Sequence, residues 1–502
     1  MMMNLKAVNA HEHAEPPLGQ PEQVMGEDIG EERFSAADLE RFSEQLTRET
    51  EQLGHWLRSR EEPGPTRPRL GFEIEAWLID ADFQPLPRNE AFLEAFDHPM
   101  AVLELAQFNV ELNSSVYQTG TDCFCMVLEE MSETLRRAQA AAEQIGGALL
   151  LAGTLPTLLP EHLGQHHMSR RSRYRALNTA VLERRAQRPL QLEIEGHEFL
   201  RHEHCGVMLE AAATSFQIHL ETQPAVAHRV YNAALAASGP VLAASGNTPY
   251  LFGKHLWEES RIPLFERAVE VGGFGDSARG PVRRVTFGSG YLRESVAEAF
   301  QENLNHFPIL LPSHLPDNDP SLPHLRLHNG TIWRWNRPIL GVDADGSFNL
   351  RIEHRSLPAG PTLEDMLANA AFLLGLIEHL VSGAGNGHGT LPFATARDNF
   401  YAAARYGLKS RLHWQDEQPQ PARQLILHHL LPYAADGLDR LGIDGTERDH
   451  LLGIVAARVQ LGQTGSIWQQ RWVERHGRDM KGLTRAYLNW QRTGLPVHNW
   501  GV

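Results

Sequence analysis

Two glutamates stand in a segment that otherwise has the pattern of a β-strand. Residues 72–77 read Phe-Glu-Ile-Glu-Ala-Trp, although Glu is disfavoured in strands. Because strand side chains alternate between two faces, Glu73 and Glu75 share one face and Ile74 takes the other. Two carboxylates side by side repel each other, so this face either meets water or is neutralised by a cation.

Two further predicted strands repeat this arrangement. Glu111 and Asn113 share a face, with Glu104 just upstream, and Gln217 and His219 share a face of another strand. A solvent-exposed polar face explains one strand with this pattern. The recurrence of the pattern on several strands favours a metal site. Carboxylate-rich sites suit Mg²⁺ or Mn²⁺.

Another predicted strand adds arginines to the acids. Arg351, Glu353 and Arg355 share one face of residues 350–357, and guanidinium groups bind phosphate oxygens through paired hydrogen bonds. Together these residues predict a face for metal-assisted phosphoryl transfer from a nucleotide, in which positioning and charge neutralisation supply most of the catalysis. The sequence has no GxxxxGK[ST] run, which excludes a P-loop protein.

The elements that must position these residues alternate between strands and helices. Helical spacing predicts a helix over 35–60 with Ser35 as its N-cap, and further helices over 122–145 and 224–244. Half-polar alternation favours an antiparallel or mixed sheet with one wet face, in an α+β fold. The predicted strands cover residues 71–80, 108–116, 147–155, 214–222, 282–292, 330–340 and 348–357.

After Gly360 the pattern becomes helical. Thr362 and Asp365 form a capping box, and later helices are expected from Thr395, Ala422, Thr446 and Thr464. We therefore expect a flexible tail over 1–32, a catalytic domain over 33–394, and a C-terminal helical region over 395–502 that packs on the catalytic domain.

Composition excludes several classes of protein. The 502 residues include 46 Lys and Arg against 62 Asp and Glu, a net charge of −16, which argues against nucleic-acid binding. The most apolar stretch, 146–160, is shorter than the roughly 20 residues of a membrane span. With 3 cysteines and no apolar leader, the sequence predicts a protein of the reducing cytoplasm.

Several motifs, taken in order, resemble the glutamate-cysteine ligase and carboxylate-amine ligase family, which is related in fold to glutamine synthetase. The resemblance extends from about residue 70 to residue 470, and its specificity lies in the order of the motifs. These are GFEIE, VELN, QIH before a helix, SGNTPYLFG with Arg261 downstream, RIEHR, NFYAAARYGL and QTGSIWQQ.

The resemblance implies a funnel-shaped, mostly antiparallel sheet that holds ATP, an amino acid and two or three Mg²⁺ or Mn²⁺ ions. It also implies roles for individual residues. One metal would be bound by Glu73, Glu353 and either Gln217 or His219, because relatives carry HxH or QxN where this chain has QIH. A second metal would be bound by Glu75, Glu111 and Glu104. Arg355 would neutralise the transferring phosphate with help from Arg351, while Arg173, Tyr174, Arg261 and Asn113 would bind substrate.

The reaction that the resemblance implies joins a carboxylate to an amine. The side-chain carboxylate of glutamate attacks the γ-phosphate of ATP, and an amine, cysteine in the best-known members, then displaces phosphate from the acyl phosphate. Two alternatives stay open: the same chemistry with another acid or amine, and a non-catalytic nucleotide-binding relative. The intact acids weigh against the second alternative. The expected partners are therefore small molecules, neither nucleic acid nor a membrane, and a homo-oligomer is compatible with the sequence.

Overall fold

The centre of the protein is a curled antiparallel sheet, seen in a computed structural model that describes residues 30–59, 67–271, 283–383, 391–414 and 418–502. Strand β1 (Arg69–Ile79) lies in the middle and pairs with β8 on one side and β3 on the other, which confirms the expected antiparallel pairing. The order is β13 (Asn336–Val342), β14 (Phe348–Pro358), β8 (Ser215–Glu221), β1, β3 (Asn109–Asn113) and β2 (Ala101–Leu103), and β4 (Tyr117–Gln118) and β5 (Ala148–Leu150) also pair with β1.

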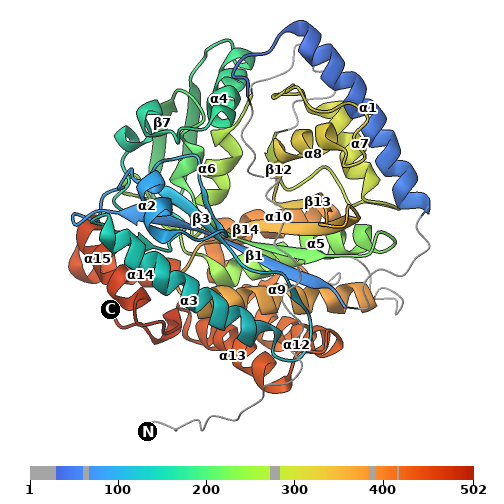
Figure 1. The fold of residues 1–502 in the computed structure, drawn as a ribbon. Helices are drawn as coiled ribbons and strands as arrows, with labels where there is room; N and C mark the ends of the chain where they lie inside the picture. The colour runs from blue at the N-terminus through green and yellow to red at the C-terminus, as the bar shows by residue number, and fades with distance from the viewer. Residues whose placement is uncertain (1–29, 60–66, 272–282, 384–390, 415–417) are drawn as a thin grey trace.

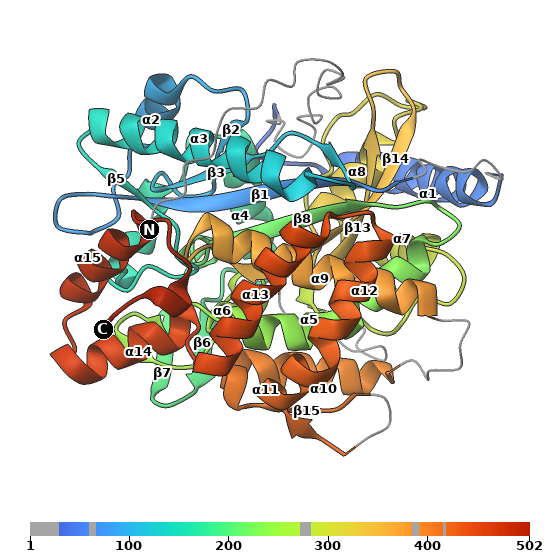
Figure 2. The same cartoon turned by 90° about the horizontal axis from the view of Figure 1, so that it is seen from below.

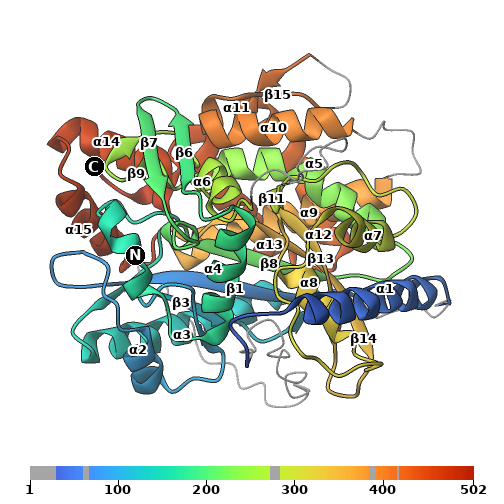
Figure 3. The same cartoon turned by 90° about the horizontal axis from the view of Figure 1, so that it is seen from above.

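Helices cover the sheet in two groups. Figures 1 and 2 show α9 (Leu363–Gly383), α12 (Leu431–Arg440) and α13 (Gly445–Leu461) on the side toward the viewer of Figure 2, where α12 and α13 pack against α9. On the other side, Figure 3 shows α1 (Ala36–Ser59) lying along α7 (Ala297–His306) and α8 (Pro323–Gly330). These last helices enclose a second, smaller core that includes Phe42, Phe300 and Leu325.

The remaining helices complete the main core. Within it, α5 (Ala227–Ser245) packs against α9, α10 and β14. The others are α2 (Asn89–Phe96), α3 (Cys123–Gln144), α4 (Ser172–Arg184), α6 (Arg261–Ala268), α10 (Phe393–Tyr406), α11 (Ala422–Leu425), α14 (Gly465–His476) and α15 (Met480–Gln491). The short two-stranded sheets are β6 (Leu190–Glu195) with β7 (Phe199–His204), β9 (Tyr250–Leu251) with β10 (Lys254–His255), β11 (Val285–Thr286) with β12 (Trp333–Arg334), and β15 (Arg411–Leu412) with β16 (Gln420–Pro421).

The capping residues predicted from the sequence mark the starts of two helices correctly. The hydroxyl of Ser35 accepts from the Asp38 amide at the start of α1, and that of Thr362 accepts from the Asp365 amide at the start of α9, so both caps are confirmed. Helix α9 is also the one element, within the described ranges, with the length and apolar composition of a membrane span. Of the most apolar 18-residue stretch of α9, 67% is buried. The apolar composition of this helix therefore reflects its place in the core.

Three strand predictions need correction. Residues 147–155 contribute only β5. The described part of 282–292, which starts at 283, contributes only β11, which pairs with β12 in parallel. Residues 330–340 are divided between β12 and β13 by a bend at Trp335. The helix expected from 224 begins at Ala227 after a turn. The hairpin of β6 and β7 was not predicted, although LQLEIE alternates as a strand should. The funnel shape and the division into domains stay predictions, and the expected tail lies almost wholly outside the described residues.

Candidate active site

Two groups of metal-ligating side chains lie next to each other on one face of the central sheet. In the first, Glu73, His219 and Glu353 bring one ligand atom each to within 4.8 Å of one another. In the second, Glu75, Glu104 and Glu111 do the same. We call these the first and the second cluster. Each cluster takes one glutamate from β1, because Glu73 and Glu75 point to the same face of that strand.

Strand pairing brings the remaining members of each cluster to β1. Glu75 stands directly opposite Glu111 of β3, and Glu73 stands opposite Gln217 of β8. His219 in turn stands opposite Glu353 of β14. Residues far apart in the sequence therefore meet through the backbone register of the sheet.

The first cluster is balanced by arginines. The Nε and Nη2 atoms of Arg337 donate to the two carboxylate oxygens of Glu353 at 2.8 and 2.9 Å, and Arg355 Nη1 lies 3.0 Å from the same carboxylate. Burial raises the pKa of Glu353, but the guanidinium groups of Arg337 and Arg355 outweigh burial and hold that pKa well below its usual range. Glu353 is therefore an anion even though it is fully buried.

His219 lies between the glutamates of this cluster. Its Nε2 atom is 2.7 Å from Glu73 and 3.9 Å from Glu353, while Arg351 Nε donates to its Nδ1 atom at 3.1 Å. Burial raises the pKa of Glu73, but the neighbouring imidazole of His219 outweighs burial, so the pKa of Glu73 is lowered. The hydrogen bond from Arg351 to His219 places Arg351 beside the first cluster.

The second cluster has an excess of negative charge. Burial and then the charge of Glu75 raise the pKa of Glu104 to about 7. Burial and then the charges of Glu73 and Glu104 raise the pKa of Glu111 well above its usual value. Closely spaced carboxylates with this charge excess are a donor set that fits a hard divalent cation, because the cation would neutralise them.

Gln217 connects the two clusters. Its Nε2 atom donates to Glu75 at 2.9 Å, and its Oε1 atom accepts from Arg355. Glu75 also accepts from the backbone amide and the hydroxyl of Ser215, both at 2.7 Å. His219 lies close to Glu73 and Glu353, whereas Gln217 contacts Glu75 and Arg355. Which of the two binds a metal ion stays a prediction.

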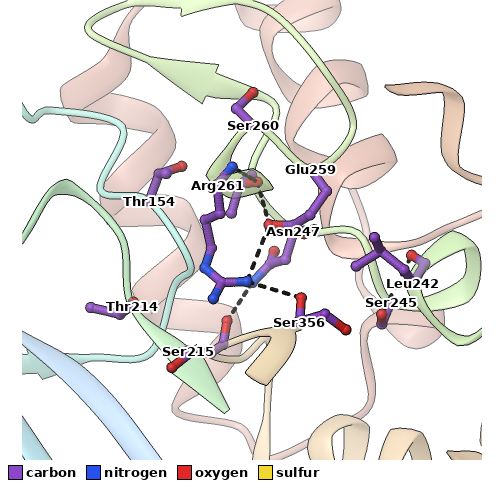
Figure 4. A network of polar contacts seen from close by, with 12 residues as sticks. Thr154, Thr214, Ser215, Leu242, Ser245, Asn247, Glu259, Ser260, Arg261 and Ser356 are labelled. Carbon is purple, nitrogen blue, oxygen red and sulfur yellow. Dashed lines mark hydrogen bonds and ion pairs between the residues drawn. The ribbon is translucent and has the colours of Figure 1, made fainter. Parts of the chain in front are cut away.

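The predicted substrate-binding residues lie at different distances from the clusters. Asn113 donates to Glu111 at 2.9 Å, and the hydroxyl of Tyr174 donates to the Leu103 carbonyl at 3.0 Å, so both border the second cluster. Arg261 is only 3% exposed and binds the Ser356 carbonyl at 3.1 Å and Glu259 at 3.7 Å (Figure 4). It therefore holds the backbone of β14 next to Arg355. The substrate-binding roles stay predictions.

Three side chains of this region were not predicted from the sequence. Arg337 is one, and its position is explained by register, since it stands opposite Glu353 in the β13–β14 pair. The other two, Asn109 and Glu210, line a small cavity together with Glu75 and Glu104. Burial and then the charges of Glu104 and Glu75 raise the pKa of Glu210 to about 8.

Comparison with known proteins identifies the chain as a carboxylate-amine ligase. The model of glutamate-cysteine ligase family 2 (GCS2) matches residues 69–485. The chain therefore belongs to this family, which confirms the resemblance seen in its motifs. A comparison with the curated proteins finds no match.

One solved structure agrees with this assignment at the level of the fold, and a second was also matched. A bifunctional glutathione synthetase from Pasteurella multocida aligns with a TM-score of 0.51 and 11% identity over 90% of this chain and 55% of that chain. This chain thus spans about half the length of that protein. A glutamate–cysteine ligase from Francisella tularensis, solved in complex with AMP, has a TM-score of 0.49 and 11% identity over 85% of this chain and 89% of that chain.

Proposed function

We propose that the protein is an ATP- and Mg²⁺-dependent ligase that joins the side-chain carboxylate of glutamate to an amine such as cysteine, giving a γ-glutamyl amide. One observation carries the proposal: two acid clusters lie side by side on the sheet, and Arg355 contacts both Glu353 of the first cluster and Gln217, which connects the two. Membership of the glutamate-cysteine ligase family supports the reaction class. A cytoplasmic location and small-molecule partners belong to the same proposal.

The residues of both clusters suit two Mg²⁺ or Mn²⁺ ions. Glu73, His219 and Glu353 would hold one ion, and Glu75, Glu104 and Glu111 would hold the other. When bound, the ions would neutralise negative charge on ATP and offset the repulsion of two anions that approach each other.

The protein side chains then orient and neutralise the reacting groups. In the first step, a carboxylate oxygen of glutamate forms a bond to the γ-phosphorus and the bond from that phosphorus to ADP breaks. In the second, the amine nitrogen forms a bond to the acyl carbon, phosphate leaves, and the nitrogen loses a proton. Arg355 and Arg351, which are tethered to Glu353 and His219, supply positive charge to the transferring phosphate. Neither cluster contains a cysteine, so none is needed as a nucleophile.

Phosphate release in the presence of ATP, Mg²⁺ and glutamate is expected to depend on an amine. A panel of amino acids and amines, read by phosphate release and by mass spectrometry of the product, identifies the acceptor. Dependence on cysteine supports the γ-glutamyl-cysteine product, and dependence on another amine supports the same chemistry with another acceptor. Failure to bind nucleotide even with Mg²⁺ would contradict the enzyme and leave the non-catalytic alternative.

Cation binding to the second cluster is expected to tighten as the pH rises. Glu104, whose pKa is raised to about 7, must lose its proton before it binds a cation. Between about pH 6 and about pH 8 this one group predicts a roughly tenfold gain in Mn²⁺ affinity, with proton release. Isothermal titration calorimetry in two buffers of different ionisation enthalpy measures both quantities. The Glu104→Gln variant should show a weaker pH dependence, because only Glu75 and Glu111, whose pKa values are also raised, then remain to lose protons. A pH-independent affinity of the wild type would contradict the assignment.

A further inference from the structure

A small cavity adjoins the second cluster, and two members of that cluster, Glu75 and Glu104, line it. Its volume is about 10 Å³, which is room for one water-sized group. The lining residues are Glu75, Glu104, Leu105, Asn109, Glu210, Ala211, Ala213 and Thr214. Oxygen atoms of acidic and amide side chains thus surround a space that is too small for a metal ion with its own water shell.

Asn109 supplies the first sign that this cavity binds a ligand. It lies on β3, two residues before Glu111 and on the same face, and it is 3% exposed. Within the described part of the chain, neither its Oδ1 nor its Nδ2 atom has a hydrogen-bond partner. Buried amides are nearly always satisfied, so an amide that lines a cavity without a partner indicates that something else completes its hydrogen bonds.

Glu210 supplies the second sign. It begins the 3₁₀ turn Glu210–Ala212 just before β8, and it lies outside both acid clusters. The described residues offer its carboxylate neither a hydrogen bond nor an ion pair, although the charges of Arg173 and Arg355 reach it. A third carboxyl group at this cavity offers oxygen atoms that the two proposed metal sites do not use.

We propose that this cavity binds the ammonium group of a free α-amino acid substrate. An ammonium group is about the size of a water molecule and donates three hydrogen bonds, which Glu104, Glu210 and the Oδ1 atom of Asn109 are placed to accept. The charge of Arg173 reaches Glu210, so a cation that could attract the carboxylate of the same amino acid lies within electrostatic range of the cavity. This inference rests on the proposed function, because it assigns one of the substrates of that reaction to a place in the site.

The test compares amino acids with their N-acetyl derivatives, which lack the ammonium group. Isothermal titration calorimetry on the full-length protein, saturated with Mg²⁺ and a non-hydrolysable ATP analogue, uses L-glutamate, L-cysteine, N-acetyl-glutamate and N-acetyl-cysteine. At least one amino acid is expected to bind about tenfold more tightly than its N-acetyl form. In Glu210→Gln that preference should disappear, while affinity for the ATP analogue stays within about twofold of wild type.

Two further variants make the result specific. Asn109→Leu approximately keeps the side-chain volume and removes the amide. It should weaken the binding of the same amino acid and leave the binding of its N-acetyl form unchanged. Glu133→Gln, on the exposed surface of α3, is the matched control and should keep the full preference.

Three outcomes would overturn the inference: equal binding of both forms to the wild type, a preference retained in Glu210→Gln, or no binding of either amino acid to the nucleotide-bound protein. Loss of a bound Mn²⁺ in Glu210→Gln, with amino acid binding intact, would also overturn it by making the cavity a cation site. Selective amino acid binding without any ATP-dependent phosphate release would instead refute the proposed function and leave the ammonium pocket standing.

Discussion

Glu353→Gln is expected to lower turnover by at least about a thousandfold while the protein stays folded. The carboxylate is fully buried, and it is the anion that Arg337 and Arg355 share. The amide of glutamine cannot neutralise either guanidinium group. The substitution also removes one charged ligand from the first cluster. The seven residue pairs of the β13–β14 ladder do not involve the side chain, so the sheet should persist. Initial rates of phosphate release and far-UV circular dichroism at one temperature measure the two effects.

The control for this prediction is a glutamate that lies outside both clusters. Glu133→Gln removes a charge of the same type on exposed α3 and should keep wild-type turnover. Activity of Glu353→Gln close to that of the wild type would rule out Glu353 as a ligand of an essential metal.

The second large effect concerns stability and comes from Arg458→Met. Arg458 of α13 is 1% exposed, and its guanidinium group donates to Asp365 of α9 at 2.9 Å, to Asn369 at 2.6 Å and to the Ala244 carbonyl at the end of α5 at 2.9 Å. Without it, the carboxylate of Asp365 is a buried charge that lacks its cation. Breaking a buried pair from one side costs about 3–5 kcal/mol of the free energy of unfolding. Urea unfolding followed by circular dichroism measures the loss.

A surface pair gives the comparison. Arg440 binds Asp436 within α12 at 3.0 Å, and both side chains are about half exposed. Arg440→Met should therefore leave the free energy of unfolding nearly unchanged. Equal losses in the two variants would show that the buried pair does not hold α13 to α9.

The faces of the strands could be predicted from the sequence because they depend only on residue spacing. A period of two puts Glu73 with Glu75, Gln217 with His219, and Glu353 with Arg355, and the structure brings these residues together at the site. Helix ends marked by Ser35 and Thr362 were equally local signals. No knowledge of distant parts of the chain was needed for either.

The rest depends on pairings between distant segments, which spacing does not determine. Arg337 lies in NRPILGV, which has no catalytic pattern, and it meets Glu353 only through the register of β13 and β14. Asn109 and Glu210 face the same cavity only after β3 and the turn before β8 have both packed against β1. Burial gives these side chains their properties, and burial is a result of the whole fold.

The placement of both clusters on one strand has a consequence for how the site can vary. Glu73 and Glu75 are two residues apart in β1, so their Cα atoms are separated by about 6.6 Å, the repeat of an extended chain. Strand β1 is paired on both sides, with β3 and β8, so its extended backbone fixes the distance between the two glutamates. Movement of a loop does not change this distance. Under the proposed function, loops can therefore diverge to accept other acids and amines while the spacing of the two clusters stays the same.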